Sequence, residues 1–448
     1  MSKVLICLHV DTEGPLYESK VELFKRINEI FGLELAATDE NLARLQAKTL
    51  DLGGIEAEVA QAVDPHSIGF KTDWGAIRQM LEKIMAPPFR NQMLDSAGKG
   101  WVFNWHVMDH AGYQNNPRRR DLGFLNIFDF YQEMIEVTGS SQDALHWHFH
   151  PVNFFGDAHH CATSYTNNYP LLNEVISRRV VERSWFPAVN RAGFHSERSD
   201  GHLFLEQWIP FDPSNQSVPV DQEPKFQRDL SGGRFGDWRM APSDWSWYHP
   251  HHDNYQLPGQ CRRVIARALN LKARHRSINV EEIEKAFKKA QAGEVVYLGL
   301  TNHDWRDMAA EVDEFRGMLK QVAARYPSVP FYFKESVEAF RELVYPQTDC
   351  SAEALDFEAK VVATEGQTRL EVTLKKGALF GPQPWLAIKT KGQTYHHDNF
   401  DLGEPGKSFV YVFDSHTLSL DQVESLGVAA NDRYANQCIR LLHSGRDF

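Results

Sequence analysis

Residues 3–15 read KVLICLHVDTEGP, an apolar run that ends in two carboxylates two positions apart. The segment KVLICLHV has the composition of a short buried strand. Charged side chains are rarely buried without partners, so Asp11 and Glu13 would be poor choices for a core. Their place at the end of the strand instead predicts a functional site beyond it.

A strand followed by a helix recurs along the chain. Further strands are predicted at 101–108, 144–151 and 294–304, where apolar runs end in polar residues. Apolar residues at helical spacing predict helices at 18–31, 39–50, 72–85, 124–137, 169–183 and 280–293. This alternation predicts a parallel α/β sheet or barrel.

The pattern changes near residue 350. Short alternating runs at 357–366, 368–377, 384–392 and 408–418 are separated by Gly, Pro and Asp, which is typical of a small β-sandwich. We therefore predict a barrel over residues 1–348, with a helical insertion at about 16–95, and a sandwich-like accessory domain over 349–448.

Composition excludes several classes of partner. The 448 residues include 48 basic and 60 acidic side chains, a net charge of −12 that argues against nucleic acid and anionic membranes as partners. No apolar run is long enough for a membrane span, and the first residues lack the pattern of a secretory signal. The five cysteines are scattered, as expected of reduced thiols, so a cytoplasmic location is predicted.

Three predicted strands end in ionisable residues. Besides Asp11 and Glu13, the stretch HWHFHP places His146, His148 and His150 within five residues, and GLTNHD ends in His303 and Asp304. Ligands of parallel α/β folds bind beyond the carboxyl ends of the strands. Two neutral imidazoles and a carboxylate suit Zn²⁺ or a similar divalent ion and leave a position open for water.

The spacing of the three histidines permits two different ligand pairs. In an extended strand His146 and His148 point the same way, roughly 6.6 Å apart, as an HxH pair. His146 and His150 would be roughly 13 Å apart in such a strand. They meet only if the chain turns helically after the strand, and Pro151 neither requires nor forbids that turn.

The motifs TEGP, HWHFHP, NRAGFHS and GLTNHD stand in the same order as those of the NodB-homology polysaccharide deacetylases, carbohydrate esterase family 4, which the chain resembles. The resemblance implies a distorted (β/α) barrel and hydrolysis of an acyl amide, typically an N-acetyl group of a sugar. It also implies Glu13, His146 and His150 as ligands of a divalent metal ion, in first place zinc. Arg191 would orient the site and His303 would be the general acid.

One departure from the family concerns the base. The position of the family's catalytic base holds Thr12, which cannot accept a proton at neutral pH. Asp11 is the nearest carboxylate and shares a face with Glu13 if the strand continues. We predict Asp11 as the base and Glu13 as the ligand, with the reverse assignment as the alternative.

The substrate is predicted to be a carbohydrate or a small-molecule amide. Trp185 and Trp247 offer flat faces for a sugar ring, and Asp304 completes the predicted substrate-binding set; core packing is the alternative for the aromatic residues. Two other functions stay open. One is an amidohydrolase that uses His146 and His148 as an HxH pair, and the other is a catalytically silent carbohydrate-binding homologue.

Overall fold

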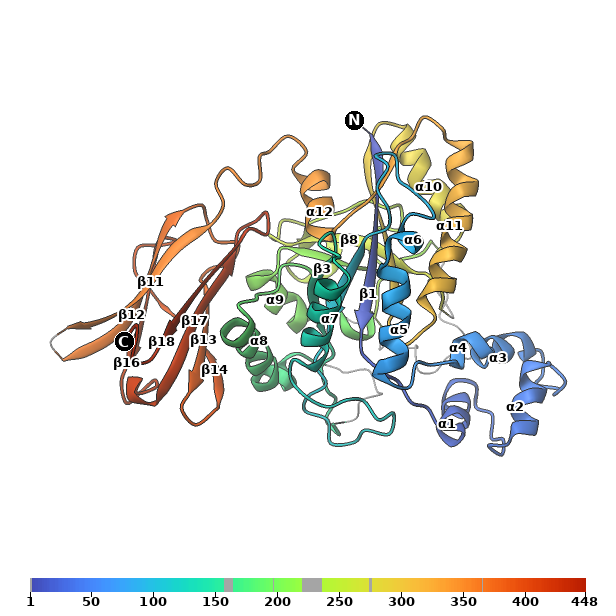
Figure 1. Cartoon of the computed structure of the whole chain (residues 1–448), viewed down its shortest axis with the longest axis horizontal. Coiled ribbons are helices and arrows are strands. Elements are labelled where there is room, and N and C mark those ends of the chain that lie inside the picture. Colours follow the sequence, from blue (N-terminus) through green and yellow to red (C-terminus); the bar gives the residue numbers. More distant parts are fainter. Residues whose placement is uncertain (1, 157–163, 196, 220–235, 274–275, 365) are drawn as a thin grey trace.

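The computed structural model describes the chain apart from residues 1, 157–163, 196, 220–235, 274–275 and 365 (Figure 1). A parallel α/β barrel is followed by a C-terminal region of antiparallel sheets. Within the described ranges, none of the helices has the length and apolar character needed to cross a bilayer.

The barrel is built from eight parallel strands: β1 (Lys3–Thr12), β2 (Phe103–Val107), β3 (Ala144–Phe149), β4 (Asn190–Ala192), β5 (Phe211–Asn215), β8 (Val264–Asn270), β9 (Val295–His303) and β10 (Phe331–Phe333). Their order is β4-β3-β2-β1-β9-β8-β5, and β10 pairs with the first half of β1. A single bridge between Val189 and Phe211 joins the two edges, so the barrel is nearly closed. This agrees with the predicted α/β fold class.

The strand β1 is buried on both faces. Its even-numbered residues, such as Leu8 and Val10, pack against the surrounding helices. The odd-numbered residues point into the barrel, since side chains alternate along a strand. Leu5 lies in the apolar layer at the start of the barrel, and Asp11 lies at its far end.

Helices surround the barrel. They are α5 (Trp74–Met85), α6 (Pro87–Arg90), α7 (Asn126–Val137), α8 (Tyr169–Arg183), α9 (Ser199–Trp208), α10 (Val280–Gln291), α11 (Met308–Arg325) and α12 (Ser336–Val344). The long predicted helices are present, and α5 begins behind Asp73, whose side chain accepts a hydrogen bond from the Ala76 amide. Helix α12 packs on the apolar layer around Leu5 and so covers the end of the barrel opposite Asp11.

The predicted insertion at 16–95 divides into two parts. Helices α1 (Lys20–Phe31), α2 (Asp39–Gln46), α3 (Glu56–Ala62) and α4 (Pro65–Ile68) form a small unit, and the first three bury their own apolar cluster. Helices α5 and α6 belong to the barrel shell instead. The small unit lies beyond the arrowhead of β1 in Figure 1, at the end of the barrel where the strands finish.

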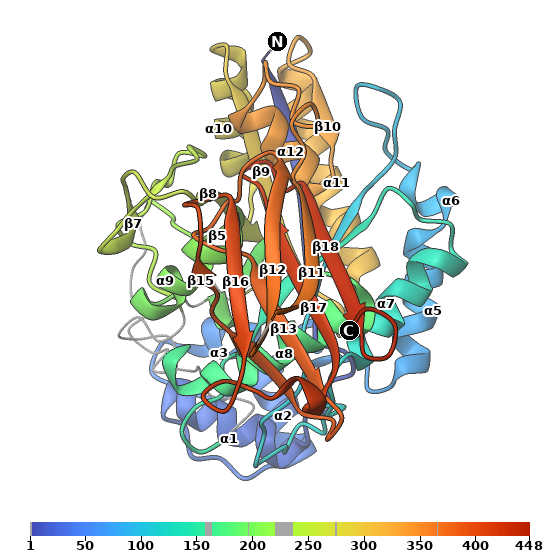
Figure 2. The same cartoon turned by 90° about the vertical axis from the view of Figure 1, so that its left-hand side faces the viewer.

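The C-terminal region has two four-stranded antiparallel sheets (Figure 2). The strands of one are β11 (Asp356–Thr364), β12 (Gln367–Lys376), β15 (Asp401–Leu402) and β16 (Ser408–Phe413); those of the other are β13 (Trp385–Thr390), β14 (Tyr395–Asp398), β17 (Val423–Asn431) and β18 (Gln437–His443). Both sheets contribute to one apolar core. The second sheet also packs on α8, and Trp385 of this sheet is fully buried against Phe204 and Trp208 of α9.

Candidate metal centre

Four barrel strands bring most of the predicted catalytic residues to one end of the barrel. Asp11 pairs in register with His303 between β1 and β9, and His148 pairs with Arg191 between β3 and β4. Glu13 follows directly after β1. Because these strands are parallel, their carboxyl ends meet at the same rim.

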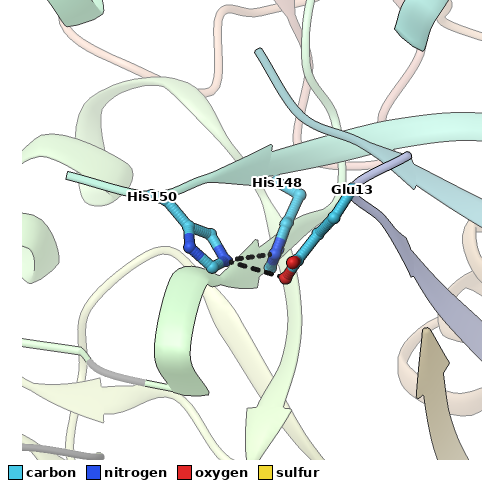
Figure 3. Close-up of side chains that lie close together, drawn as sticks. All are labelled: Glu13, His148 and His150. Carbon is cyan, nitrogen blue, oxygen red and sulfur yellow. Dashed lines mark hydrogen bonds and ion pairs between the residues drawn. The ribbon is translucent and has the colours of Figure 1, made fainter. Parts of the chain in front are cut away.

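Glu13, His148 and His150 form a buried group whose ligand atoms all lie within 4.8 Å of one another (Figure 3). The Nε2 atoms of the two histidines are 2.8 Å apart. The His150 Nε2 atom is also 3.4 Å from Oε1 of Glu13. Such a group, with two imidazoles and one carboxylate, could hold a metal ion.

The hydrogen bonds of His148 support this interpretation. Its Nδ1 atom lies 2.9 Å from the Arg191 carbonyl oxygen, which can only accept, so the ring proton is assigned to Nδ1. The other ring nitrogen, Nε2, faces Nε2 of His150. Burial lowers the pKa of His150 well below its usual value, so this ring is neutral. The donor set fits a divalent ion, because ligating imidazoles must be neutral and are oriented by the bond that their other nitrogen makes.

His146, which the family resemblance implies as a ligand, lies outside this group. Its Nε2 atom lies 3.1 Å from Oδ1 of Asn104 and 3.1 Å from Oε1 of Glu335. The Asn104 amide nitrogen donates to the carbonyl oxygens of Leu8 and Lys334, so Oδ1 is the atom that faces His146. With two acceptors around it, Nε2 carries a proton and has no lone pair for a metal ion.

The two histidines of this group therefore have HxH spacing, but they are not the predicted HxH pair of His146 and His148. His146 and His148 point into the barrel from the same strand, one level apart. Only His148 reaches the level of Glu13, where His150 joins it just after the strand ends. The helical turn that would bring His146 to His150 does not occur, since residues 150–153 are irregular.

Asp11 is held by a bidentate contact with Arg191. Nε and Nη2 of the arginine lie 3.2 and 3.1 Å from the two carboxylate oxygens, and both side chains are buried. Burial alone would raise the pKa of Asp11, but Arg191, His148 and His303 outweigh it and lower the pKa well below its usual value. Asp11 is thus an ionised carboxylate beside the metal group, in the position expected of a base.

His303 faces both carboxylates. Its Nε2 atom lies 3.9 Å from Oδ2 of Asp11 and 3.8 Å from Oε1 of Glu13. Burial lowers the pKa of His303 to about 4, so the ring is neutral at pH 7. The Trp305 ring packs against it with a centroid distance of 4.8 Å, which restricts the imidazole on one side.

Asp304, which is predicted to bind substrate, is hydrogen-bonded to the protein itself. It is fully buried, and its carboxylate accepts hydrogen bonds from the backbone amides of Glu13 and Gly14 and from the Tyr131 hydroxyl. Gly14 adopts a φ of 68°, and a Cβ atom there would lie 2.8 Å from the Trp74 ring. This tight turn fixes the direction in which Glu13 points.

The two predicted substrate-binding tryptophans lie in packed regions. Trp185 packs against Phe128 and against the guanidinium of Arg179 on the outer side of the barrel. Trp247 packs on the apolar layer that includes Leu5 and Phe340, at the end of the barrel opposite the metal group. Core packing, the alternative in the sequence analysis, describes both residues.

A second set of histidines lies one level below the site. The His106 Nδ1 atom is 3.2 Å from the Trp147 carbonyl oxygen, so its proton lies on Nδ1 and its Nε2 accepts from Nδ1 of His9 at 2.9 Å. His9 Nε2 then accepts from the Tyr297 hydroxyl at 2.8 Å. These interactions complete a structural hydrogen-bond chain within the barrel.

Arg120 was not anticipated as part of the site. Its guanidinium contacts the carboxylate of Glu13, although it lies in the stretch NNPRRRD, whose three consecutive arginines resemble an ordinary charged loop. His148 was anticipated only as a member of the other HxH pair. The sequence contained no signal that distinguished Arg120 from its two neighbours.

Comparison with known proteins gives no further guidance. No family model matches the chain, and no match was found among curated proteins or solved structures. The resemblance to the polysaccharide deacetylases therefore rests on the four short motifs alone.

Proposed function

We propose that this protein is a metal-dependent hydrolase that cleaves a carbon–nitrogen amide bond and removes an acyl group, in first place N-acetyl, from a sugar or polysaccharide precursor. The observation that carries the proposal is the grouping of Glu13, His148 and His150 beside Asp11 and His303 at the end of the barrel. A metal-ligand set, an ionised carboxylate and an imidazole are the components that amide hydrolysis needs.

The residues would hold zinc or a similar ion through Oε1 of Glu13 and Nε2 of His148 and His150. Such an ion supplies Lewis acidity, which polarises the scissile carbonyl and acidifies the attacking water. Three protein ligands leave a coordination position open, as catalytic zinc sites require.

Asp11 and His303 would move the proton. As the water oxygen bonds to the carbonyl carbon, Asp11 accepts the water proton. The His303 Nε2 atom, 3.9 Å from Oδ2 of Asp11, then receives this proton. The imidazolium so formed protonates the nitrogen as the carbon–nitrogen bond breaks, releasing an amine and an acid. Arg191 acts as a positioning residue, because it fixes both oxygens of Asp11.

A second candidate is a hydrolase of small-molecule amides. It is favoured by the HxH spacing of His148 and His150, which differs from the ligand spacing implied by the deacetylase resemblance. The same catalytic residues would serve, and only the substrate would differ.

The test begins with metal analysis of the purified protein, followed by an amine-release screen. The panel contains N-acetylated sugars, sugar nucleotides and small amides, each assayed with metal-loaded, metal-free and Asp11→Asn protein. We expect amine release from the metal-loaded protein only. Release from small amides alone would favour the second candidate. Substrate binding without any release would support a catalytically silent homologue and overturn the proposal.

A further inference from the structure

The two carboxylate oxygens of Glu13 have different surroundings. Oε2 accepts a hydrogen bond from Nη2 of Arg120 at 2.5 Å and another from Nε1 of Trp305 at 3.3 Å. Oε1 instead faces Nε2 of His150 at 3.4 Å, on the side of the metal group. One oxygen is therefore occupied by the protein, and the other is available to an ion.

Arg120 is firmly anchored in this position. Its side chain is almost fully buried, and Nη1 also reaches the carbonyl oxygen of Glu13 at 3.3 Å. Its backbone amide donates to Oδ1 of Asn116, and its carbonyl oxygen accepts from the Asn116 side chain, both at 2.8 Å. A buried, doubly anchored guanidinium on a carboxylate gives a strong and directional contact.

We propose that Arg120 is a positioning residue that restricts Glu13 to a single ligand atom, with help from Trp305. The inference rests on the proposed metal centre, but it does not depend on the reaction or on the substrate. A carboxylate that binds an ion through both oxygens occupies two coordination positions. Holding Oε2 back keeps one of these positions for water and substrate.

The guanidinium has a second effect on the ion. A fixed positive charge next to a ligand opposes the binding of a dication, and this repulsion is large in a buried site. The site therefore binds the ion less tightly than it would without Arg120, and one coordination position of the ion remains free for water or substrate. Loss of Arg120 should therefore have the opposite effect from loss of a ligand, because it should strengthen metal binding.

The experiment compares Arg120→Met, which removes both charge and donors, with Arg120→Lys, which keeps the charge. Arg118→Met is the matched control from the same loop, since the Arg118 side chain bonds to Glu18 and not to Glu13. Zinc affinity is measured by competition with a chelator, and coordination is followed by the visible absorption of the Co²⁺-substituted protein, which weakens as coordination number rises.

We expect Arg120→Met to bind zinc at least about tenfold more tightly, the direction required by removal of a buried like charge. Its Co²⁺ bands should weaken, while Arg120→Lys and Arg118→Met should resemble the unaltered protein. Unchanged affinity and spectrum in Arg120→Met, or loss of metal to the extent seen in Glu13→Gln, would overturn the proposal.

Two further measurements test the role of Arg120 separately from the folding of Arg120→Met and from the proposed reaction. If Arg120→Met does not fold, Trp305→Phe removes the other donor to Oε2 and should cause a smaller weakening of the same bands; an unchanged spectrum there would count against the proposal. If no amide is cleaved but the Arg120 series behaves as expected, the proposed reaction fails and the positioning role stands. If metal-dependent amide cleavage is found but the Co²⁺ spectra of the Arg120 variants are unchanged, the proposed reaction stands and the positioning role of Arg120 fails.

Discussion

Two groups of histidines lie at neighbouring levels inside the barrel. The lower group, His9, His106 and His146, is bonded to protein partners, including the Trp147 carbonyl oxygen, the Tyr297 hydroxyl and Glu335. In the upper pair, His148 and His150, the Nε2 atoms face each other beside Glu13. Residue type is the same at both levels, so the surrounding acceptors decide which imidazoles are available to a metal ion.

The comparison shows how one carbonyl group can set the chemistry of a histidine. The Trp147 oxygen fixes the proton of His106 and thereby determines the direction of the chain through His9 to Tyr297. The Arg191 oxygen fixes the proton of His148 in the same way, but there the other nitrogen meets a second imidazole. Two imidazole nitrogens 2.8 Å apart can share a proton or hold a cation between them.

The largest expected difference between the two groups is in metal binding. His148→Ala and His150→Ala should each abolish stoichiometric zinc binding, because each removes a ligand nitrogen. His146→Gln should keep the ion, since its Nε2 is a hydrogen-bond donor. Metal analysis after gel filtration would decide. A metal-free His146→Gln protein together with a loaded His150→Ala protein would restore the pair implied by the family resemblance.

The next effect separates Asp11 from Glu13. Asp11→Asn keeps the shape of the side chain but cannot accept a proton, so turnover should fall about 10²–10⁴-fold while the ion remains bound. Glu13→Gln should lose most of the ion and regain part of its activity with excess metal. Rates are to be measured beside metal content. An empty Asp11→Asn protein and a loaded Glu13→Gln protein would reverse the two roles.

A smaller effect on stability should distinguish the lower group. Tyr297→Phe removes the hydroxyl that donates to His9 and leaves a buried acceptor unpaired, which should lower the free energy of unfolding by about 1–3 kcal/mol. His150→Gln, measured with chelator present, should cost less, because no donor among the described side chains depends on it alone. Urea unfolding followed by fluorescence measures both. Equal losses would mean that the upper pair is as structural as the lower group.

Much of the fold could be predicted from local patterns. Helix α5 follows from its Asp73 cap and apolar spacing, and the alternation of strands and helices gives the parallel barrel. The meeting of Asp11 with His303 also follows, because carboxyl ends of parallel strands share one rim.

Which histidines join the candidate metal group could not be predicted in this way. Whether His146 or His148 reaches Glu13 depends on the register of β3 against β2, where His146 pairs with His106. That register is a property of the assembled sheet. The same holds for Arg120, whose contact with Glu13 spans 107 residues of sequence. The sequence predicts Asp304 at the correct end of the barrel. It does not show that the backbone amides of Glu13 and Gly14 donate hydrogen bonds to its carboxylate.

The smallest expected effect concerns pH. Burial lowers the pKa of His9 and His106 well below the usual value, so the folded protein keeps them neutral while the unfolded chain can protonate them below about pH 6.5. The unfolded state therefore binds more protons, and the stability that these groups contribute is present above pH 6.5 and is lost as the pH falls. Each such histidine adds about 1.4 kcal/mol per pH unit to the slope at most. His9→Gln should reduce the slope between pH 6 and 5 by up to this amount, measured by urea unfolding with chelator present. An unchanged slope would show that His9 titrates alike in both states and that the lower group is not held neutral.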